Sequence, residues 1–483
     1  MSTMNLTLLT DLYELTMMQG YFKNNCNETV VFDMFYRTNP CGNGYAICAG
    51  LDQLIDYIRR LSFSDEDIAY LDSLHLFEDD FLEYLRGFHF SGDIYAIPEG
   101  TVVFPREPLV KVVAPIMEAQ LVETALLTII NHQSLIATKT ARVVYAADGG
   151  GVMEFGLRRA QGPDAGVYGA RAAMIAGCIG TSNVLAGQMF DVPVKGTHAH
   201  SWIMSFPDEY TAFKKYSELY PDACCLLVDT YDTLKSGVPN AIRVFTEMRE
   251  SGIELKNYGI RLDSGDLAYL TKRARQMLDE AGFSDAFISA SSDLDEYLIT
   301  SLKSQGCKID SWGVGTNMIT SKDCPAFGGV YKLAAVQDEN GNFIPKIKLS
   351  ENIEKITNPG NKTVFRIYEK ADHKIKADLI CLADETFDNT RDLTIFDPLE
   401  TWKRTKLKAG TYELRELLVP VFKNGECVYT SPSVMELRDI CSKELDTLWE
   451  EHRRLINPSQ MYVDLSDQLY DIKKNLLHQM SME

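Results

Sequence analysis

Two histidines separated by one residue stand in the segment GTHAHSWIMSF, residues 196–206. They are conspicuous because the chain has only eight histidines among 483 residues. An imidazole is largely neutral near pH 7, so it can act as a nucleophile or as a proton carrier. His198 and His200 are therefore candidates for chemistry, although a single histidine near a strand end is more often structural.

A second candidate is IRLDSGD, residues 260–266, which combines an arginine with two carboxylates. Arg261 and Asp263 share one face of an expected strand, since side chains repeat every two residues, and Asp266 follows the turn at Gly265. Such a group suits a sugar diol or a magnesium ion, with the guanidinium holding an anion. A strand-end salt bridge is the structural alternative.

Glycines and arginines at two further points suggest phosphate binding. In SWGVGTNMITS, residues 311–321, Gly313, Gly315 and Thr316 precede an expected helix, where backbone amides can approach a phosphate. In MEFGLRRAQGPDAG, residues 153–166, Arg158 and Arg159 follow a strand-like run. Together these features favour a phosphorylated sugar as ligand.

The elements that must position these residues are eight short apolar runs between 152 and 336, each ending in small or polar residues. Helical patterns follow most of them, which predicts parallel βα units closing into a barrel, with the active site at the carboxyl ends of the strands. Those ends supply Arg158, Asn183, Thr197, His200, Asp229, Asp263, Asp266, Ser291, Ser292, Asp293, Gly313, Gly315 and Thr316.

The rest of the chain has a different texture, with short strands punctuated by proline before 115 and further strand pieces after 337. We predict an α/β protein with a TIM-like barrel, 126–336, and a separate strand-rich α+β domain. That domain combines 1–125 with 337–435, and a helical segment, 436–483, ends the chain.

The formal net charge of −20 argues against nucleic acid and anionic membrane surfaces as partners. Eleven cysteines without a Cys-x-x-Cys pair indicate neither a disulfide framework nor a structural zinc site. The N-terminus lacks a signal-peptide pattern, and we expect a cytoplasmic protein. The cluster of Lys403, Arg404, Lys406 and Lys408 could lie near phosphates, but solvent is the expected surrounding.

Taken together, the motifs resemble those of the nicotinate phosphoribosyltransferase family along nearly the whole chain. The resemblance is carried by LTDLYELTMMQGYF, AIPEGTVVFPREPL, ETALLTIINHQSLIATKTARV, EFGLRRAQGPDAG, GTHAHSWIMSF, LLVDTYDT, IRLDSGDL, GVGTNMITS, GGVYKLAAV and LINPSQMYVDLSDQL.

The resemblance implies a fold in which an irregular TIM-like α/β barrel packs on a smaller α+β domain. It also implies transfer of phosphoribosyl from 5-phosphoribosyl 1-pyrophosphate to nicotinate, giving nicotinate mononucleotide and pyrophosphate for NAD biosynthesis. It also implies Mg²⁺, coupling to ATP hydrolysis through a phosphohistidine, and a homodimer with the active site at the interface. The magnesium is expected to bind through phosphates, with Asp263 or Asp266 as the possible protein ligand.

The family's motifs also imply roles for single residues. His200 is expected to be the phosphorylated nucleophile and, with Asp263, a catalytic residue, whereas His198 occupies a variable position. The expected substrate-binding residues are Tyr13, Phe155, Arg158, Asn183, Thr197, Arg261, Gly265, Ser292, Gly315 and Thr316. Of these, the resemblance assigns Tyr13, Thr197 and Arg261 to nicotinate, and the counterpart of Tyr13 reaches the neighbouring subunit's site in dimeric members.

Three other functions stay open from the sequence. A nicotinamide phosphoribosyltransferase shares much of the rim, although Arg261 and Thr197 favour the carboxylate of nicotinate. A catalytically silent barrel could bind a phosphorylated metabolite. A barrel isomerase or aldolase would need a catalytic lysine, for which Lys195 and Lys332 are candidates.

Overall fold

The computed structural model describes residues 5–352, 355–398 and 400–482, and its internal contacts divide the chain into two compact units. We call residues 136–325 the barrel unit and residues 1–135 with 326–483 the terminal unit. The sequence pattern places the boundaries at 125/126 and 336/337. The terminal unit also includes the C-terminal helical segment, and it has more residues than the barrel unit, although the sequence predicts the smaller domain there.

The barrel unit is built on six parallel strands, in the spatial order β7-β6-β11-β10-β9-β8. Their bounds are β6 Gly151–Glu154, β7 Gly180–Thr181, β8 Cys224–Leu227, β9 Tyr258–Leu262, β10 Phe287–Ser292 and β11 Ser311–Val314. The last strand of the unit, β11, pairs with the first, β6, so the sheet curls back on itself. The predicted α/β fold class is confirmed.

Two of the eight predicted strand units differ. The run VPVKGT contributes only an isolated parallel bridge between Thr181 and Val194, which leaves β8 as an edge strand of the described sheet. The run VYKLAAV is strand β12 (Gly329–Gln337), and it pairs antiparallel with β1 (Thr29–Tyr36) in the terminal unit. The prediction of an eighth barrel strand was wrong because a local apolar pattern does not specify a distant pairing partner.

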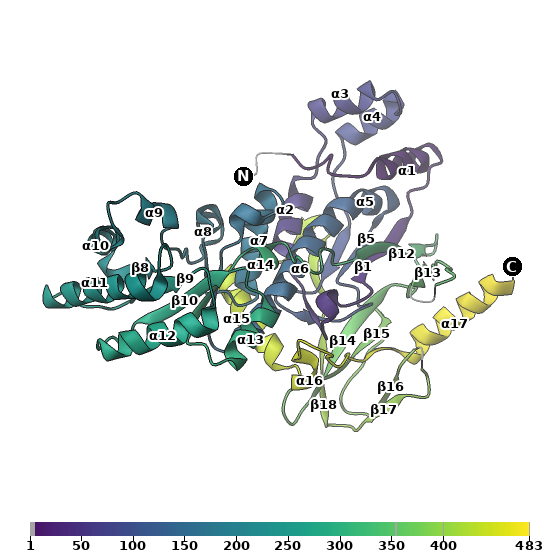
Figure 1. Ribbon diagram of the computed structural model, residues 1–483. Helices are drawn as coiled ribbons and strands as arrows, with labels where there is room; N and C mark the ends of the chain where they lie inside the picture. Colours follow the sequence, from purple (N-terminus) through teal and green to yellow (C-terminus); the bar gives the residue numbers. More distant parts are fainter. Residues whose placement is uncertain (1–4, 353–354, 399, 483) are drawn as a thin grey trace. The chain divides into compact units, whose positions relative to one another are not determined.

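Helices separate the strands of the barrel unit, and α11 and α12 lie beside its teal strands in Figure 1. Helix α12 illustrates why they pack there: Asp266 caps its first turn through Tyr269 N, and Leu267, Ala274 and Leu278 form its buried face. The helices are α7 Pro163–Ile175, α8 Val184–Phe190, α9 His200–Met204, α10 Glu209–Leu219, α11 Val238–Glu250, α12 Leu267–Glu280, α13 Glu296–Ser304 and α14 Thr316–Ile319. Two short 3-10 turns, η2 Leu157–Arg159 and η3 Pro221–Ala223, and one π-helical segment, η4 Thr233–Gly237, complete the unit.

The terminal unit is organised around a seven-stranded antiparallel sheet in the order β13-β12-β1-β5-β3-β19-β20. A four-stranded sheet, β18-β14-β15-β21, and two strand pairs, β16-β17 and β2-β4, complete it. The remaining strands are β2 Ala46–Ile47, β3 Asp93–Ala96, β4 Val102–Val103, β5 Val110–Pro115, β13 Phe343–Pro345, β14 Lys362–Glu369, β15 Ile375–Leu382, β16 Leu393–Phe396, β17 Arg404–Leu407, β18 Tyr412–Glu416, β19 Val419–Lys423, β20 Glu426–Cys427 and β21 Val463–Leu465.

A large apolar core joins the seven-stranded sheet of this unit to its helices. The helices are α1 Leu12–Lys23, α2 Leu51–Arg60, α3 Asp65–Ser73, α4 Asp79–Arg86, α5 Ile116–Leu121, α6 Glu123–Ala147, α15 Val434–Asp446, α16 Glu450–Arg453 and α17 Asp467–Met482, with a short turn η1 Pro40–Gly42. Helix α6 continues past Leu135, where the barrel unit begins. None of the described helices is long and apolar enough to cross a membrane.

Candidate active site

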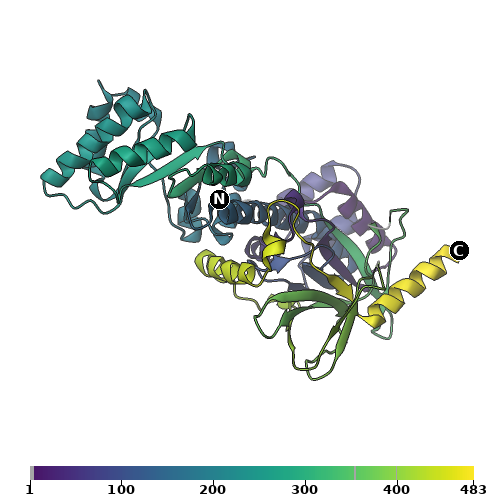
Figure 2. The same cartoon turned by 60° about the horizontal axis from the view of Figure 1, so that its bottom comes forward.

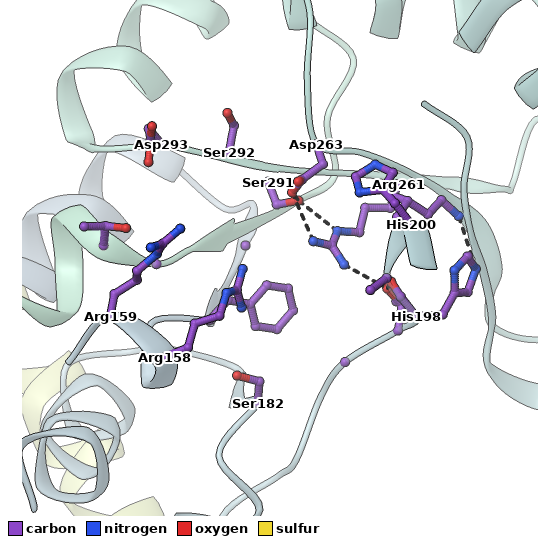
Figure 3. A pocket seen from close by; sticks show the side chains of 18 residues that line it. Arg158, Arg159, Ser182, His198, His200, Arg261, Asp263, Ser291, Ser292 and Asp293 are labelled. Carbon is purple, nitrogen blue, oxygen red and sulfur yellow. Dashed lines mark hydrogen bonds and ion pairs between the residues drawn. The ribbon is translucent and has the colours of Figure 1, made fainter. Parts of the chain in front are cut away.

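A cavity of about 630 Å³ opens at the carboxyl ends of the parallel strands of the barrel unit. Figure 3 shows Arg158 and Arg159 on one side of this cavity and His198 and His200 on the other. The lining residues are Phe155, Arg158, Arg159, Ser182, Gly196, Thr197, His198, Ala199, His200, Leu227, Arg261, Asp263, Ser291, Ser292, Asp293, Gly313, Gly315 and Thr316. Nine of the predicted site residues are therefore brought together: Phe155, Arg158, Thr197, His200, Arg261, Asp263, Ser292, Gly315 and Thr316.

Arg261, on β9, is held from three sides. Its guanidinium donates to Ser291 Oγ at 2.8 Å, to Thr197 Oγ1 at 3.0 Å and to Asp263 Oδ1 at 3.0 Å, and its side chain is 15% exposed. It also lies 5.7 Å from the centre of the Phe155 ring. These bonds fix a cation beside an aromatic ring, which is a suitable arrangement for a flat ligand that carries an anionic group.

His200 is the first residue of α9, and its Nε2 lies 3.1 Å from Asp229 Oδ1. The Asp229 side chain is only 2% exposed, and its other oxygen accepts from Asp263 N at 2.9 Å and from Ser264 Oγ at 2.6 Å. A neutral His200 that donates Nε2–H to this carboxylate keeps the lone pair on Nδ1. With 38% of its side chain exposed, His200 is also accessible to a ligand.

Asp229 has no role in the sequence-based assignment, where it is only one of the polar strand ends. Its signal is its place two residues after β8 in the run LLVDT, at the same end of the sheet as Asp263. Ser182, Ser291 and Asp293 also line the cavity without an assigned role. Their functional importance depends on which strand ends meet, and this is a property of the folded sheet.

His198 has a different environment from His200. Its Nε2 accepts a long hydrogen bond of 3.4 Å from Leu227 N, on the edge strand β8, and its ring packs 4.6 Å from the ring of Tyr216. Burial lowers the pKa of His198 to about 4, so the imidazole is neutral at pH 7 and can act as an acceptor. These contacts agree with a structural role for His198.

Close packing around Phe155 depends on two glycines. A Cβ at Gly313 would lie 2.6 Å from the Phe155 ring, and a Cβ at Gly315 would lie 3.2 Å from the Phe155 carbonyl oxygen. Below them, burial raises the pKa of Glu154, which accepts hydrogen bonds from the Thr181 hydroxyl and the Gly156 amide. Because Gly313 and Gly315 have no side chain, the Phe155 ring can form one wall of the cavity.

Two groups at the rim have features typical of binding sites. Arg158 and Arg159 on η2 are exposed, and neither forms an ion pair within the described chain. Ser292, at the end of β10, has a φ of 147°, a region that side chains other than glycine rarely adopt. Unpaired guanidinium groups and a strained backbone at one rim are expected where an anionic ligand binds.

Four predicted residues do not line the cavity. Asn183 is buried, accepts from Ala186 N as the cap of α8 and donates to Gly166 O. Asp266 caps α12, and Gly265 forms the preceding turn with a φ of 82°. Tyr13 lies on α1 in the terminal unit with 45% of its surface exposed.

The metal prediction left Asp263 and Asp266 as possible ligands. Of the two, Asp263 lines the cavity, whereas Asp266 is occupied as a helix cap. Among the described residues, no group of three or more His, Cys, Asp or Glu side chains could hold a metal ion by itself. Asp263 and Asp293 both line the cavity and offer carboxylate oxygens, the type of ligand that magnesium prefers.

The fold and the cavity define an α/β barrel protein with a polar, cation-rich site for a small anionic ligand. Family models cover most of the chain: the nicotinate phosphoribosyltransferase N-terminal domain matches residues 8–131, the nicotinate phosphoribosyltransferase family model matches 151–337, and the C-terminal domain matches 361–473. The chain belongs to the nicotinate phosphoribosyltransferase family.

Several proteins are similar to this chain over nearly their full length. Nicotinate phosphoribosyltransferase from Bacillus subtilis is 47% identical over 478 residues, covering 98% of this chain and 96% of the relative. The human protein of that name is 32% identical over 528 residues, covering 97% of this chain and 96% of the relative. The crystal structure of human nicotinic acid phosphoribosyltransferase superposes with a TM-score of 0.83 at 30% identity, covering 97% of this chain and 99% of that one.

Proposed function

We propose that this chain transfers the phosphoribosyl group of 5-phosphoribosyl 1-pyrophosphate to the ring nitrogen of nicotinate, in the salvage of nicotinate for NAD biosynthesis. The observation that carries the proposal is the fixed Arg261 beside Thr197 and the Phe155 ring. The ring of nicotinate can pack on Phe155 while its carboxylate meets the guanidinium and the hydroxyl. Nicotinamide lacks the negative charge that this arginine binds, so nicotinate is the preferred substrate.

The reaction breaks the bond between C1 of the ribose and pyrophosphate and forms a bond between C1 and the pyridine nitrogen. Positive charge develops on the ribose while negative charge develops on the leaving pyrophosphate. Arg158 and Arg159 are available to stabilise that pyrophosphate, and Asp263 is available for the ribose hydroxyls. The pyridine nitrogen already carries a lone pair, so the residues of this chain need only to bind and orient the reactants.

The coupling to ATP is assigned to His200. In the proposed step Nδ1 attacks the γ-phosphorus, a phosphorus–nitrogen bond forms, the bond from phosphorus to the bridging oxygen breaks and ADP leaves. Asp229 supports the step because it holds Nε2–H and stabilises the positive charge that develops on the ring. Arg261, on β9, holds the segment that precedes His200 in place through its hydrogen bond to Thr197.

Magnesium and the assembly belong to the same proposal. Bound magnesium supplies charge neutralisation at the phosphates, with Asp263 and Asp293 as its available protein donors.

A homodimer is supported by the exposed apolar side chains of α1, among them Leu12, Tyr13 and Met17. The eleven free cysteines agree with a reducing cytoplasmic location.

The test is incubation of the purified protein with magnesium, phosphoribosyl pyrophosphate and nicotinate, with and without ATP. Nicotinate mononucleotide is followed by chromatography for the wild type, for His200→Ala and for the matched control His198→Ala. We expect product, an increase with ATP, and loss of that increase only in His200→Ala. Comparable turnover of nicotinamide would contradict the substrate assignment, and ligand binding without any product would favour a silent barrel.

A further inference from the structure

The terminal unit has its own positively charged cavities, which share no lining residue with the cavity of the barrel unit. One has a volume of about 190 Å³ and the other about 20 Å³, and both are lined by Arg106 and Ile356. The larger is also lined by Pro398, Tyr470, Lys473, Lys474 and Leu477, and the smaller by Asp33, Phe35, Pro108, Thr357, Asn358 and Lys362. We call the two together the Arg106 cavity, and we propose that it binds a small anion of the phosphate class.

Charge supplies the first argument. The lining includes four cationic side chains but only one carboxylate, Asp33, which is already paired with Lys362 at 2.7 Å. Within the described chain, Arg106 and Lys474 form no ion pair, and the polar partner of Lys473 is the neutral amide of Asn358 at 2.8 Å. An excess of unpaired cations in one cavity is unexpected in a chain with a net charge of −20.

Partial burial makes the charge of Lys473 unfavourable in the absence of a ligand. The pKa of Lys473 is lowered to about 8, first by burial and then by repulsion from Arg106 and Lys362. An anion between Lys473 and Arg106 would remove this repulsion. The cavity is therefore better suited to an anionic ligand than to water alone.

Two further observations point to a ligand. The hydroxyl of Thr357, a residue only 4% exposed, has no hydrogen-bond partner, although a buried hydroxyl normally has one. Arg106 adopts a φ of 76°, and its amide donates to Tyr36 O at 2.7 Å. A strained arginine held by its backbone and an unused buried hydroxyl are features of binding sites.

The walls indicate the size of the ligand. Tyr470 and Leu477 of α17, with Pro398 and Ile356, add apolar side chains to the lining of the larger cavity, beside the cations Lys473 and Lys474 of the same helix. Figure 2 shows α17, in yellow, beside the green strands of the terminal unit. A volume of about 190 Å³ is below that of ordinary drug-sized pockets, so the expected ligand is a phosphate monoester with a small organic body.

The test compares anion binding by the full-length wild type, Lys473→Met, Arg106→Gln and the control Lys215→Met, whose lysine is exposed and paired with Glu218 in the barrel unit. Isothermal titration is performed separately with inorganic phosphate and with ribose 5-phosphate. The barrel cavity contributes equally in all four proteins, so differences report the Arg106 cavity. We expect the wild type and Lys215→Met to bind the anion at the Arg106 cavity with the same affinity. In Lys473→Met and in Arg106→Gln that affinity should fall about tenfold or more, because each variant loses one charge-assisted contact.

The two probes distinguish the ligand's source: stronger binding of ribose 5-phosphate supports a phosphate monoester, and equal binding supports free phosphate. Identical isotherms in all four proteins would overturn the proposal. If Lys473→Met does not fold, wild-type crystals soaked in tungstate decide the question. An anomalous peak between Arg106 and Lys473 supports the site, and density confined to the barrel cavity refutes it.

Discussion

The substitution Asp229→Asn tests the proposed nucleophile most directly. An asparagine side chain has nearly the same shape, and its carbonyl oxygen can still accept from Asp263 N and Ser264 Oγ. Its NH₂ group then faces His200 Nε2, where a carboxylate oxygen stands in the wild type. Because the NH₂ group is a donor, Nε2 must become the acceptor and the proton moves to Nδ1. The nitrogen that should attack phosphorus is then blocked.

The expected loss follows from the single bond that changes. A hydrogen bond to a charged group contributes about 1.5–3 kcal/mol, and about 1.4 kcal/mol corresponds to a factor of ten in rate. The rate of phosphorylation of His200 should therefore fall about 10- to 150-fold. The fold should be retained, because both backbone and hydroxyl donors to residue 229 keep an acceptor.

The assay is incorporation of acid-labile label from γ-labelled ATP into the protein, followed over time beside the ATP-dependent increase in product. His200→Ala gives the background, and Asp222→Asn, an exposed change on η3, is the matched control. ATP-independent product formation should change much less than labelling. A labelling rate in Asp229→Asn equal to that of the wild type would refute the tautomer argument and, with it, the role given to Asp229.

Three further changes test separate features. Gly313→Ala places a methyl group 2.6 Å from the Phe155 ring, so it should displace the ring, raise the KM for nicotinate and lower the melting temperature; an unchanged KM contradicts the role of Phe155 as a wall of the nicotinate site. Ser292→Gly removes backbone strain at a φ of 147° and should raise the free energy of unfolding in urea by about 1 kcal/mol. A lower free energy of unfolding would show that the serine side chain stabilises the fold by more than the backbone strain costs. In acid, the unfolded state protonates His198 below its ordinary pKa of 6.5, whereas the folded state does so only near 4, so its contribution to stability falls as the pH drops through that range. His198→Phe should consequently lose less stability than the wild type between pH 7 and pH 5, and an equal loss in both proteins rules out this account.

The sequence was sufficient to predict the strand ends that form the cavity. Arg261 lies in β9 and binds Asp263, the residue directly after that strand, while Gly313 lies in β11 and Gly315 directly after it, at the predicted edge. These predictions depend on local geometry. They needed only the correct strand assignment and the rule that parallel strands place their carboxyl ends together.

What the sequence could not supply depends on contacts between distant segments. The pattern in β12 is that of a strand, but pairing with β1 rather than with the barrel depends on contacts about three hundred residues away. Asn183 and Asp266 have the residue types of ligand-binding groups, yet both are used as helix caps. The partnership of Asp229 with His200 likewise becomes visible only when β8 and α9 lie close together.

The pairing of β1 with β12 also has a consequence for the order in which the chain can fold. Strand β1 emerges early in synthesis, and of its two partners only β5 is near in sequence, whereas Val336, opposite Val30, is made much later. The barrel unit lies wholly between them, so it can complete its own sheet once β11 has been made. The terminal unit must wait with one side of β1 unpaired. Slow translation or a truncated chain should therefore expose this strand to aggregation before it affects the barrel.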